Sequence, residues 1–152
     1  MIYMAQRIEI HEYLPHTEPM LMVDYITSLD REHVKTVFEI KPDNIFVEND
    51  VFCESGLIEN AAQTCSAIVA RSYFVDEEGN DLPKKKVIGF ISSVKSVKIH
   101  SLPQVGSLIN TEAELKLRFD AESYITCLIG CKSYRGDELL LEGEINLMVR
   151  EA

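Results

Sequence analysis

The second half of the chain alternates apolar and polar residues with a period of two. Between Ile109 and Phe119 most odd-numbered positions are apolar and the even-numbered ones are polar, and the same alternation recurs in 123–131 and 139–149. Successive side chains of a strand point to opposite faces, so each segment predicts a strand with one face in the core and one in water. In all three segments the odd-numbered residues, including Leu117, are predicted to face inward.

Three earlier segments also read as strands. Residues 20–27 and 33–40 flank a turn-like stretch at 28–31 and predict a β-hairpin. Residues 87–100 change parity along their length, which predicts a bulge or strong bend near 92–96.

One long helix is predicted from Leu57 to about Val75, because this stretch has no interior Gly or Pro and repeats apolar residues at i, i+3 and i+4. The order of hairpin, helix and antiparallel strands predicts an α+β fold in which a curved sheet wraps a central helix. With 152 residues the chain has room for a single domain, taken as 1–152. The open sheet edge favours a homodimer.

Composition narrows the possible functions. Hydrophobic residues make up 46% and charged residues 26%, as in a soluble globular protein, and the net charge of -10 argues against a nucleic-acid partner. No apolar run approaches the ~20 residues that span a bilayer. The four cysteines lack CxxC spacing and no targeting segment is recognised, so we expect a cytoplasmic protein with reduced thiols, Cys127 and Cys131 in the core, and no metal site.

Glu59 is the first candidate for chemistry, because it lies near the start of an apolar helix. Burial favours the neutral acid, whereas the positive end of the helix dipole favours the carboxylate. Gln63 and Ser66 follow at i+4 and i+7 and can orient the carboxyl group; alternatively, Glu59 is simply exposed. Ser55 or Gly56 can cap the helix, and backbone N–H groups there either polarise a substrate carbonyl or only cap.

Four histidines are available as general bases. His16 lies in a loop that two prolines stiffen, His33 lies on the polar side of its strand, and His100 ends a strand; each also has a purely structural explanation. The sequence contains no GxSxG elbow, P-loop, Rossmann glycine motif or HExxH. The corresponding serine hydrolase, nucleotide-binding and zinc-protease functions therefore have no support in the sequence.

Two segments carry a resemblance to a known family. They are 13–24, which contains Leu-Pro-His and Pro-Met-Leu-Met-Val-Asp, and 56–63, an apolar helix start followed by Glu and Ala-Gln. Residues 89–99 and the Pro-Gly turn at 103–106 are similar to the family's interface strand and the turn after it. Over nearly the whole chain the sequence resembles the hot-dog fold 3-hydroxyacyl-[acyl carrier protein] dehydratases.

The resemblance implies roles for individual residues. In that family a histidine removes a proton from C2 of an acyl thioester, a carboxylic acid protonates the departing 3-hydroxyl, and two subunits form each site. Glu59 is then the acid, Gln63 positions it, and Gly56 with the amides after it binds the thioester carbonyl. No cofactor is implied, because the substrate is carried on phosphopantetheine.

The sequence departs from the family upstream of the helix, where residues 46–53 lack the family's His-Phe-Pro-Gly stretch. This gap resembles the divergent dehydratases of aryl-polyene-type pathways. It makes His16 our candidate for the base, with His100 as the alternative.

Three functions remain open. The first is a dehydratase or hydratase acting on a fatty or polyene acyl thioester of acyl carrier protein or coenzyme A. The second is a hot-dog thioesterase in which Glu59 acts alone, and the third is a non-catalytic subunit in a heterodimer with a related dehydratase. An acidic carrier protein would need basic docking residues, for which the candidates are 84–86, Lys95, Lys98 and Arg118.

Overall fold

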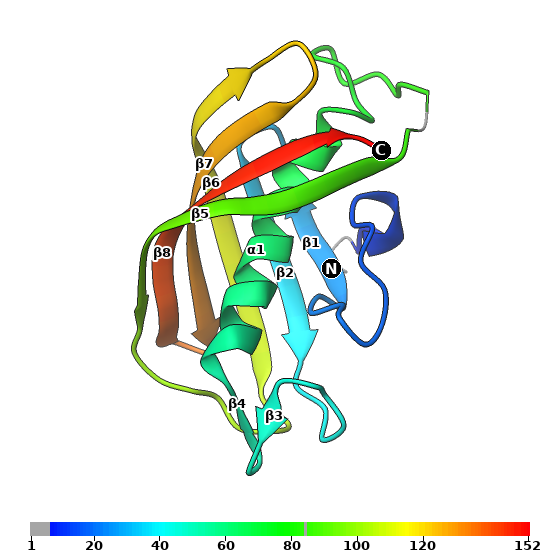
Figure 1. Ribbon diagram of the computed structural model, residues 1–152. Coiled ribbons are helices and arrows are strands. Elements are labelled where there is room, and N and C mark those ends of the chain that lie inside the picture. The colour runs from blue at the N-terminus through cyan, green and yellow to red at the C-terminus, as the bar shows by residue number, and fades with distance from the viewer. Residues whose placement is uncertain (1–6, 84) are drawn as a thin grey trace, which may run out of the picture.

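The computed structural model describes residues 7–83 and 85–152, and at its centre one long helix is held in a curved antiparallel sheet (Figure 1). The elements in chain order are the 3-10 turn η1 (Ile10–Glu12), strands β1 (Tyr25–Leu29), β2 (His33–Glu39), β3 (Val47–Glu48) and β4 (Val51–Phe52), helix α1 (Glu54–Arg71), and strands β5 (Val87–Ile99), β6 (Leu108–Asp120), β7 (Ile125–Arg135) and β8 (Glu138–Glu151). The predicted α+β layout is confirmed.

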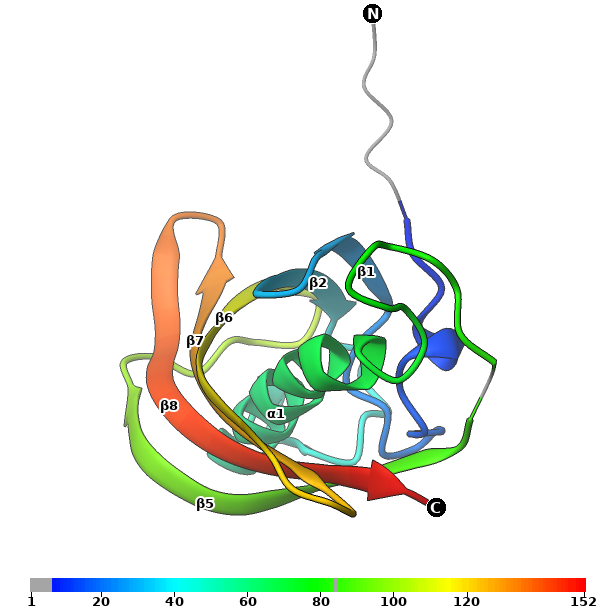
Figure 2. The same cartoon turned by 90° about the horizontal axis from the view of Figure 1, so that it is seen from above.

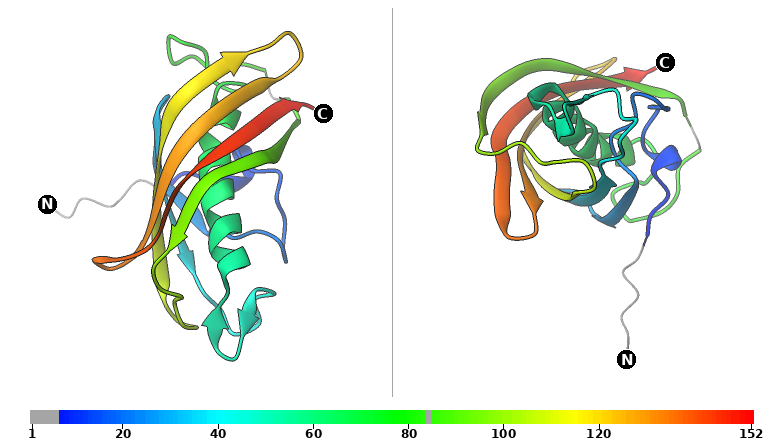
Figure 3. Two further views of the ribbon diagram at one scale, coloured as in Figure 1. Left: turned by 60° about the vertical axis from the view of Figure 1, so that its left-hand side comes forward. Right: turned by 90° about the horizontal axis from the view of Figure 1, so that it is seen from below.

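The main sheet has six strands in the order β1-β2-β6-β7-β8-β5, so β5 is an edge strand. Seen from above, the sheet curls around α1, and the N-terminal segment 7–24 lies between β1 and the start of β5 (Figure 2). The views from the side and from below agree: the strands cover one side of the helix, and this N-terminal segment lies beside it (Figure 3).

Helix α1 begins earlier and ends earlier than predicted. The N–H groups of Gly56 and Leu57 both donate to the carbonyl oxygen of Cys53, which is the N-cap. The prediction that Ser55 or Gly56 caps the helix is therefore wrong. The helix ends at Arg71, not near Val75, because the chain turns there and Val75 pairs with Asp81 in a short β-bridge. Every residue from 60 to 70 is buried, as the apolar pattern predicted.

The predicted first strand is only partly correct, since β1 starts at Tyr25 and not near Met20. Ahead of it, the N–H of Met22 donates to the side chain of Gln63, and its carbonyl accepts from the side chain of Asn60. The backbone groups of Met22 are thus bonded to helix side chains in place of a neighbouring strand.

Strand β6 follows the predicted alternation only as far as Leu115. The pairing with β7 slips by one residue between Leu115 and Leu117, so the side chains beyond this bulge change faces. Leu117 and Phe119, predicted to face inward, are therefore 68% and 64% exposed. In β5 the predicted irregularity is confirmed, with register shifts between Ile91 and Ser93 and between Val94 and Ser96.

The core lies between α1 and the concave face of the sheet. Cys127 and Cys131 on β7 are buried in it, as predicted, and burial raises the pKa of the Cys127 thiol to about 11. None of the described helices is long and apolar enough to cross a membrane.

Candidate active site

A cavity of about 290 Å³ brings together three of the predicted site residues, His16, Glu59 and Gln63. It lies between one face of α1, the loop that precedes β1, and the inner sides of β5 and β8. Apart from these three residues, Ser66 and Tyr13, the described residues that line it carry no polar side chain. The other lining residues are Tyr13, Pro15, Ala62, Ser66, Ala70, Val87, Gly89, Phe90, Ile91, Leu147 and Val149.

Gln63 holds the carboxyl group of Glu59. The amide nitrogen of Gln63 donates to Glu59 Oε1 at 2.8 Å and to the carbonyl oxygen of Met20 at 2.8 Å. The amide oxygen accepts from the N–H of Met22 at 2.7 Å, which fixes the amide's orientation. Because Gln63 is a donor toward Oε1, Oε2 is the atom on which Glu59 can carry a proton.

A second side chain, Asn60, completes this arrangement from the neighbouring helix position. Its Nδ2 donates to the carbonyl of Met22 at 2.7 Å, and its Oδ1 accepts from the hydroxyl of Thr111 on β6 at 2.7 Å. The Met22 peptide groups are thus held by Asn60 on one side and Gln63 on the other. Buried polar networks whose members are all bonded are rigid, so the position of Glu59 is tied to the sheet through Asn60.

His16 supplies a neutral imidazole to the same cavity. Burial lowers its pKa below the usual histidine value, and the nearby charge of Glu59 opposes that shift only in part. Its Nδ1 is buried and has no hydrogen-bond partner among the described residues. A buried polar atom without a partner costs about 1–3 kcal/mol, a cost that a bound ligand removes when it supplies the missing hydrogen bond.

Gly56 does not line this cavity. A Cβ at this position would lie 2.5 Å from the Phe52 ring and 2.8 Å from Cβ of Phe46, so the glycine allows these aromatic side chains to pack against the start of α1. Its N–H already donates to Cys53. The structure therefore accounts for Gly56 by packing and does not bring it to His16 and Glu59.

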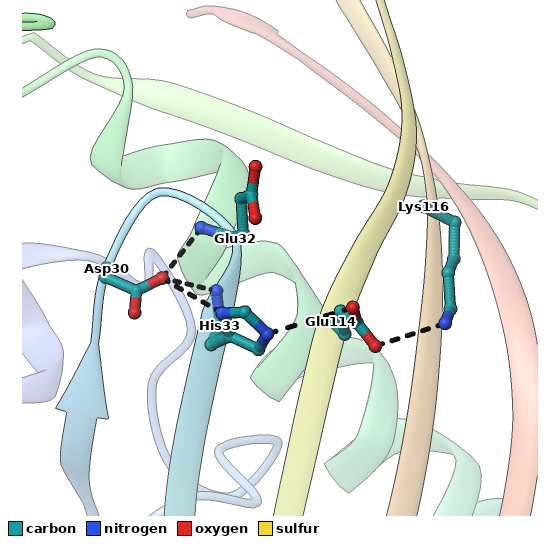
Figure 4. Close-up of polar contacts among 5 residues, drawn as sticks. All are labelled: Asp30, Glu32, His33, Glu114 and Lys116. Atoms are coloured by element: carbon teal, nitrogen blue, oxygen red, sulfur yellow. Dashed lines mark hydrogen bonds and ion pairs between the residues drawn. The ribbon is translucent and has the colours of Figure 1, made fainter.

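The other histidines lie away from the cavity. His33 is on the outer face of the sheet, where Figure 4 shows it between Asp30 and Glu114, with Nε2 3.8 Å from Glu114 Oε1. His100 is paired with Glu142 at 3.7 Å, and neither residue lines the cavity. Within 7–83 and 85–152, no cluster of three or more His, Cys, Asp or Glu side chains could hold a metal ion.

This arrangement suits proton transfer. A neutral imidazole can accept a proton and a carboxylic acid can donate one, and the two groups share a cavity that is partly shielded from water. The helix contributes small side chains to the cavity wall after Glu59, namely Ala62, Ser66 and Ala70. An apolar ligand can therefore lie along α1 with its reactive end at His16 and Glu59.

Several residues of the site were given no role by the sequence prediction, although one of them, Asn60, could have been recognised from the sequence. Asn60 interrupts an apolar helix face and is completely buried, and a buried Asn must find hydrogen-bond partners. Met22 could not be recognised from the sequence, since it binds Gln63 and Asn60 through its backbone N–H and carbonyl. Tyr13 and the β5 residues that line the cavity became visible only when the fold placed them beside α1.

Solved structures with this fold support the architecture. The dehydratase heterocomplex ApeI:P from Xenorhabdus doucetiae matches with a TM-score of 0.72 at 18% identity, over 97% of this chain and 93% of that chain. The uncharacterized protein PH1136 from Pyrococcus horikoshii matches with a TM-score of 0.61 at 14% identity, over 93% and 92% of the two chains. A hypothetical thioesterase with coenzyme A from Streptococcus pneumoniae matches with a TM-score of 0.55 at 10% identity, over 83% and 84%. The predicted hot-dog fold is confirmed.

The sequence itself identifies the family. No curated protein matches the chain at a significant level. The family model described as ApeP dehydratase, however, matches residues 8–151, nearly the full length. This match agrees with the predicted resemblance to a divergent group of dehydratases, and the chain therefore belongs to the ApeP-like family of dehydratases.

Proposed function

We propose that this chain removes water from 3-hydroxyacyl thioesters to give 2-enoyl thioesters, and that it catalyses the reverse hydration, in polyene or fatty-acyl synthesis. The observation that carries the proposal is the meeting of His16, Glu59 and Gln63 in one cavity with an apolar extension. Membership of the ApeP-like family supports the reaction class.

In the proposed reaction, His16 is the base and Glu59 the acid. The neutral imidazole takes a proton from C2 of the thioester while Glu59 Oε2 gives its proton to the 3-hydroxyl, which leaves as water as the C2–C3 double bond forms. The gained proton must then pass from the imidazolium to the carboxylate, and the shared cavity makes this transfer short. Gln63 is a positioning residue that holds Oε1 throughout.

We propose a phosphopantetheine thioester as the form of the substrate, on acyl carrier protein or coenzyme A. Of the basic residues considered for carrier docking, Lys95 is paired with Glu144 at 3.4 Å and Arg118 with Asp120 at 2.6 Å. Lys84 lies outside the described residues. The exposed Lys98 and Lys86 have no such acid contact among the described residues and are therefore the first docking residues to test.

A dimer is proposed through the edge strand β5. Its outer edge has no neighbour in the sheet, and Phe90, Ile91 and Val94 are 44%, 40% and 44% exposed. Phe90 and Ile91 also line the cavity, so a strand paired with β5 would cover the site. We propose a homodimer; the alternative is a heterodimer with a related dehydratase, which the heterocomplex of the ApeI:P structure favours.

The experiment is turnover of 3-hydroxyacyl and 2-enoyl pantetheine thioesters, measured by mass spectrometry for the wild type, Glu59→Gln and His16→Ala. Each variant should lose about 100-fold or more in kcat/KM, as expected when a general acid or base is removed. The matched controls are Glu114→Gln and His33→Ala, which remove a histidine and a glutamate paired on the outer face. Both controls should retain wild-type rates.

Each alternative function has its own outcome in this experiment. Hydrolysis of saturated thioesters, with no interconversion, would replace the dehydratase by a thioesterase. Absence of turnover by a folded wild type alone, with activity restored by a co-purified dehydratase subunit, would favour the partner-subunit function. Wild-type rates in both site variants would contradict the assignment of His16 and Glu59.

A further inference from the structure

The cavity beside Glu59 is lined by side chains along α1 and by the aromatic side chain of Tyr13. The helix residues that line it, from Glu59 to Ala70, span about 16 Å at the ~1.5 Å rise per residue of an α-helix. The lining also includes Tyr13, Pro15 and Val87, and the ring of Tyr13 packs against Phe74, which follows Ala70 by four residues.

A second cavity of about 830 Å³ lies behind these three residues. Tyr13, Pro15 and Val87 line both cavities, so together they form the partition between them. The second cavity also contains apolar side chains suited to a hydrocarbon, among them Leu14, Phe74, Leu82 and Ile88. Of the three partition residues, Tyr13 has by far the largest side chain.

Tyr13 is held in place from both its backbone and its ring. Its N–H donates to the carbonyl of Ile10 at 3.0 Å, and its ring packs edge-on against Phe74 with the ring centres 5.9 Å apart. Burial raises the pKa of the Tyr13 hydroxyl, which keeps the ring uncharged and compatible with an apolar ligand. A fixed aromatic side chain between these two cavities acts as a stop.

We propose that Tyr13 sets the length of acyl chain that this protein accepts, by closing the cavity beside Glu59 and separating it from the larger cavity behind. The inference rests on the proposed function, because it takes the acyl chain to lie along α1 with its thioester end at His16 and Glu59. It adds a specificity-determining residue to that site.

The experiment measures chain-length preference in two independent ways. One is kcat/KM for 3-hydroxyacyl pantetheine thioesters from butyryl to dodecanoyl, and the other is calorimetric affinity for the matching S-alkyl pantetheine thioethers, which cannot react. For the wild type we expect both to fall about tenfold or more per two added carbons once the chain reaches Tyr13, since a methylene without space is rejected strongly.

Three variants test the stop. Tyr13→Ala should move the drop to longer chains by joining the two cavities, whereas Tyr13→Phe keeps the ring and should keep the wild-type profile. Ala70→Leu fills the cavity from the helix side and should move the drop to shorter chains. This variant keeps the proposal testable if Tyr13→Ala fails to fold, which circular dichroism and thermal unfolding would reveal.

The outcomes separate this inference from the proposed function. Wild-type turnover with an unchanged chain-length profile in Tyr13→Ala and Ala70→Leu overturns the role of Tyr13 and leaves the dehydratase assignment intact. Shifted thioether affinities without turnover of any thioester support the stop and contradict the dehydratase. Absence of thioether binding by the wild type, together with a turnover profile that the variants do not shift, overturns the stop.

Discussion

The two faces of the sheet use polar residues in opposite ways. On the concave face they are few and each is bonded within the protein: the hydroxyl of Thr36 meets that of Thr64 on α1 at 2.7 Å, and Thr111 bonds both Asn60 and Ser133. On the convex face charged residues of alternating sign are register neighbours across five strands. In spatial order they are Lys35, Glu112, Lys132, Glu142 and Lys98.

The surroundings of each face explain the difference. The convex face has an open depression of about 590 Å³ among these charged side chains, so water screens every pair and each contributes little. The concave face excludes water, so an unpaired polar group there is costly and a paired one is held firmly. Polar residues therefore position the site on one face and mainly keep the other solvated.

The largest difference in stability is expected between two substitutions of apolar residues on β6, one on the concave face of the sheet and one on the convex face. Ile109 on β6 is fully buried, and Ile109→Ala should lower the free energy of unfolding by about 2–5 kcal/mol through the cavity it leaves. Leu117 on the same strand is 68% exposed, and Leu117→Ala should change it by no more than about 0.5 kcal/mol. Urea unfolding measures both. Equal losses would contradict the change of face at the bulge.

This pair also marks where the sequence stops predicting the fold. Alternation correctly placed Ile109 and Ala113 in the core and identified β6, β7 and β8. It succeeds there because the polarity of each side chain decides whether it faces the core or water. The bulge between Leu115 and Leu117 has no such signal, since Leu117 and Phe119 continue the apolar pattern without interruption. It is set by pairing with β7, a contact distant in sequence.

The next effect tests the network that holds the site. Asn60→Ala leaves the Met22 carbonyl without its side-chain partner and removes one of the two hydrogen bonds of the Thr111 hydroxyl, which keeps Ser133. It should lower the free energy of unfolding by about 2–3 kcal/mol. It should also lower kcat, because Met22 in turn holds Gln63. The matched control is Asn110→Ala, since Asn110 is exposed on the convex face of β6. A loss of stability in Asn60→Ala no larger than that of the control would contradict the network.

The parts of the candidate site that are made of polar side chains could be predicted from the sequence, whereas the parts made of backbone groups could not. Glu59, Gln63 and His16 stand out because a carboxylate and an amide interrupt an apolar helix and a histidine lies in a proline-stiffened loop. The role of Gly56 in substrate binding stays a prediction, while the structure shows that its backbone N–H donates inside the helix and that its missing side chain makes room for Phe52. The hydrogen bonds from Gln63 and Asn60 to Met22 involve the backbone N–H and carbonyl of Met22. Every residue has these groups, so the sequence contains no signal for this contact.

The third effect depends on pH. Because burial lowers the pKa of His16 below its usual value of about 6.5, the unfolded chain binds a proton at this residue more readily than the folded one. The free energy of unfolding should therefore fall as pH decreases from about 6.5 toward the lower pKa of the folded state, and this residue should contribute no slope above that window. The acid limb of kcat/KM should likewise lie below about pH 6.5, because the base acts when neutral.

Urea unfolding of the wild type and of His16→Gln, between about pH 7.5 and pH 5, measures this contribution. The wild type should lose stability relative to His16→Gln as the pH falls. The control His33→Gln removes a histidine from the convex face and should leave this part of the pH dependence unchanged. A constant difference between wild type and His16→Gln would show that folding does not perturb His16.

The smallest effect should come from the charged residues of the convex face. Lys132 lies between Glu112 and Glu142 in the register, so Lys132→Gln should cost less than about 0.5 kcal/mol and Lys132→Glu up to about 1 kcal/mol at low salt. At about 1 M salt, where the Debye length is ~3 Å, the difference between the two variants should largely vanish. A difference that persists at high salt would mean that these side chains are shielded from water, and the contrast between the two faces of the sheet would then fail.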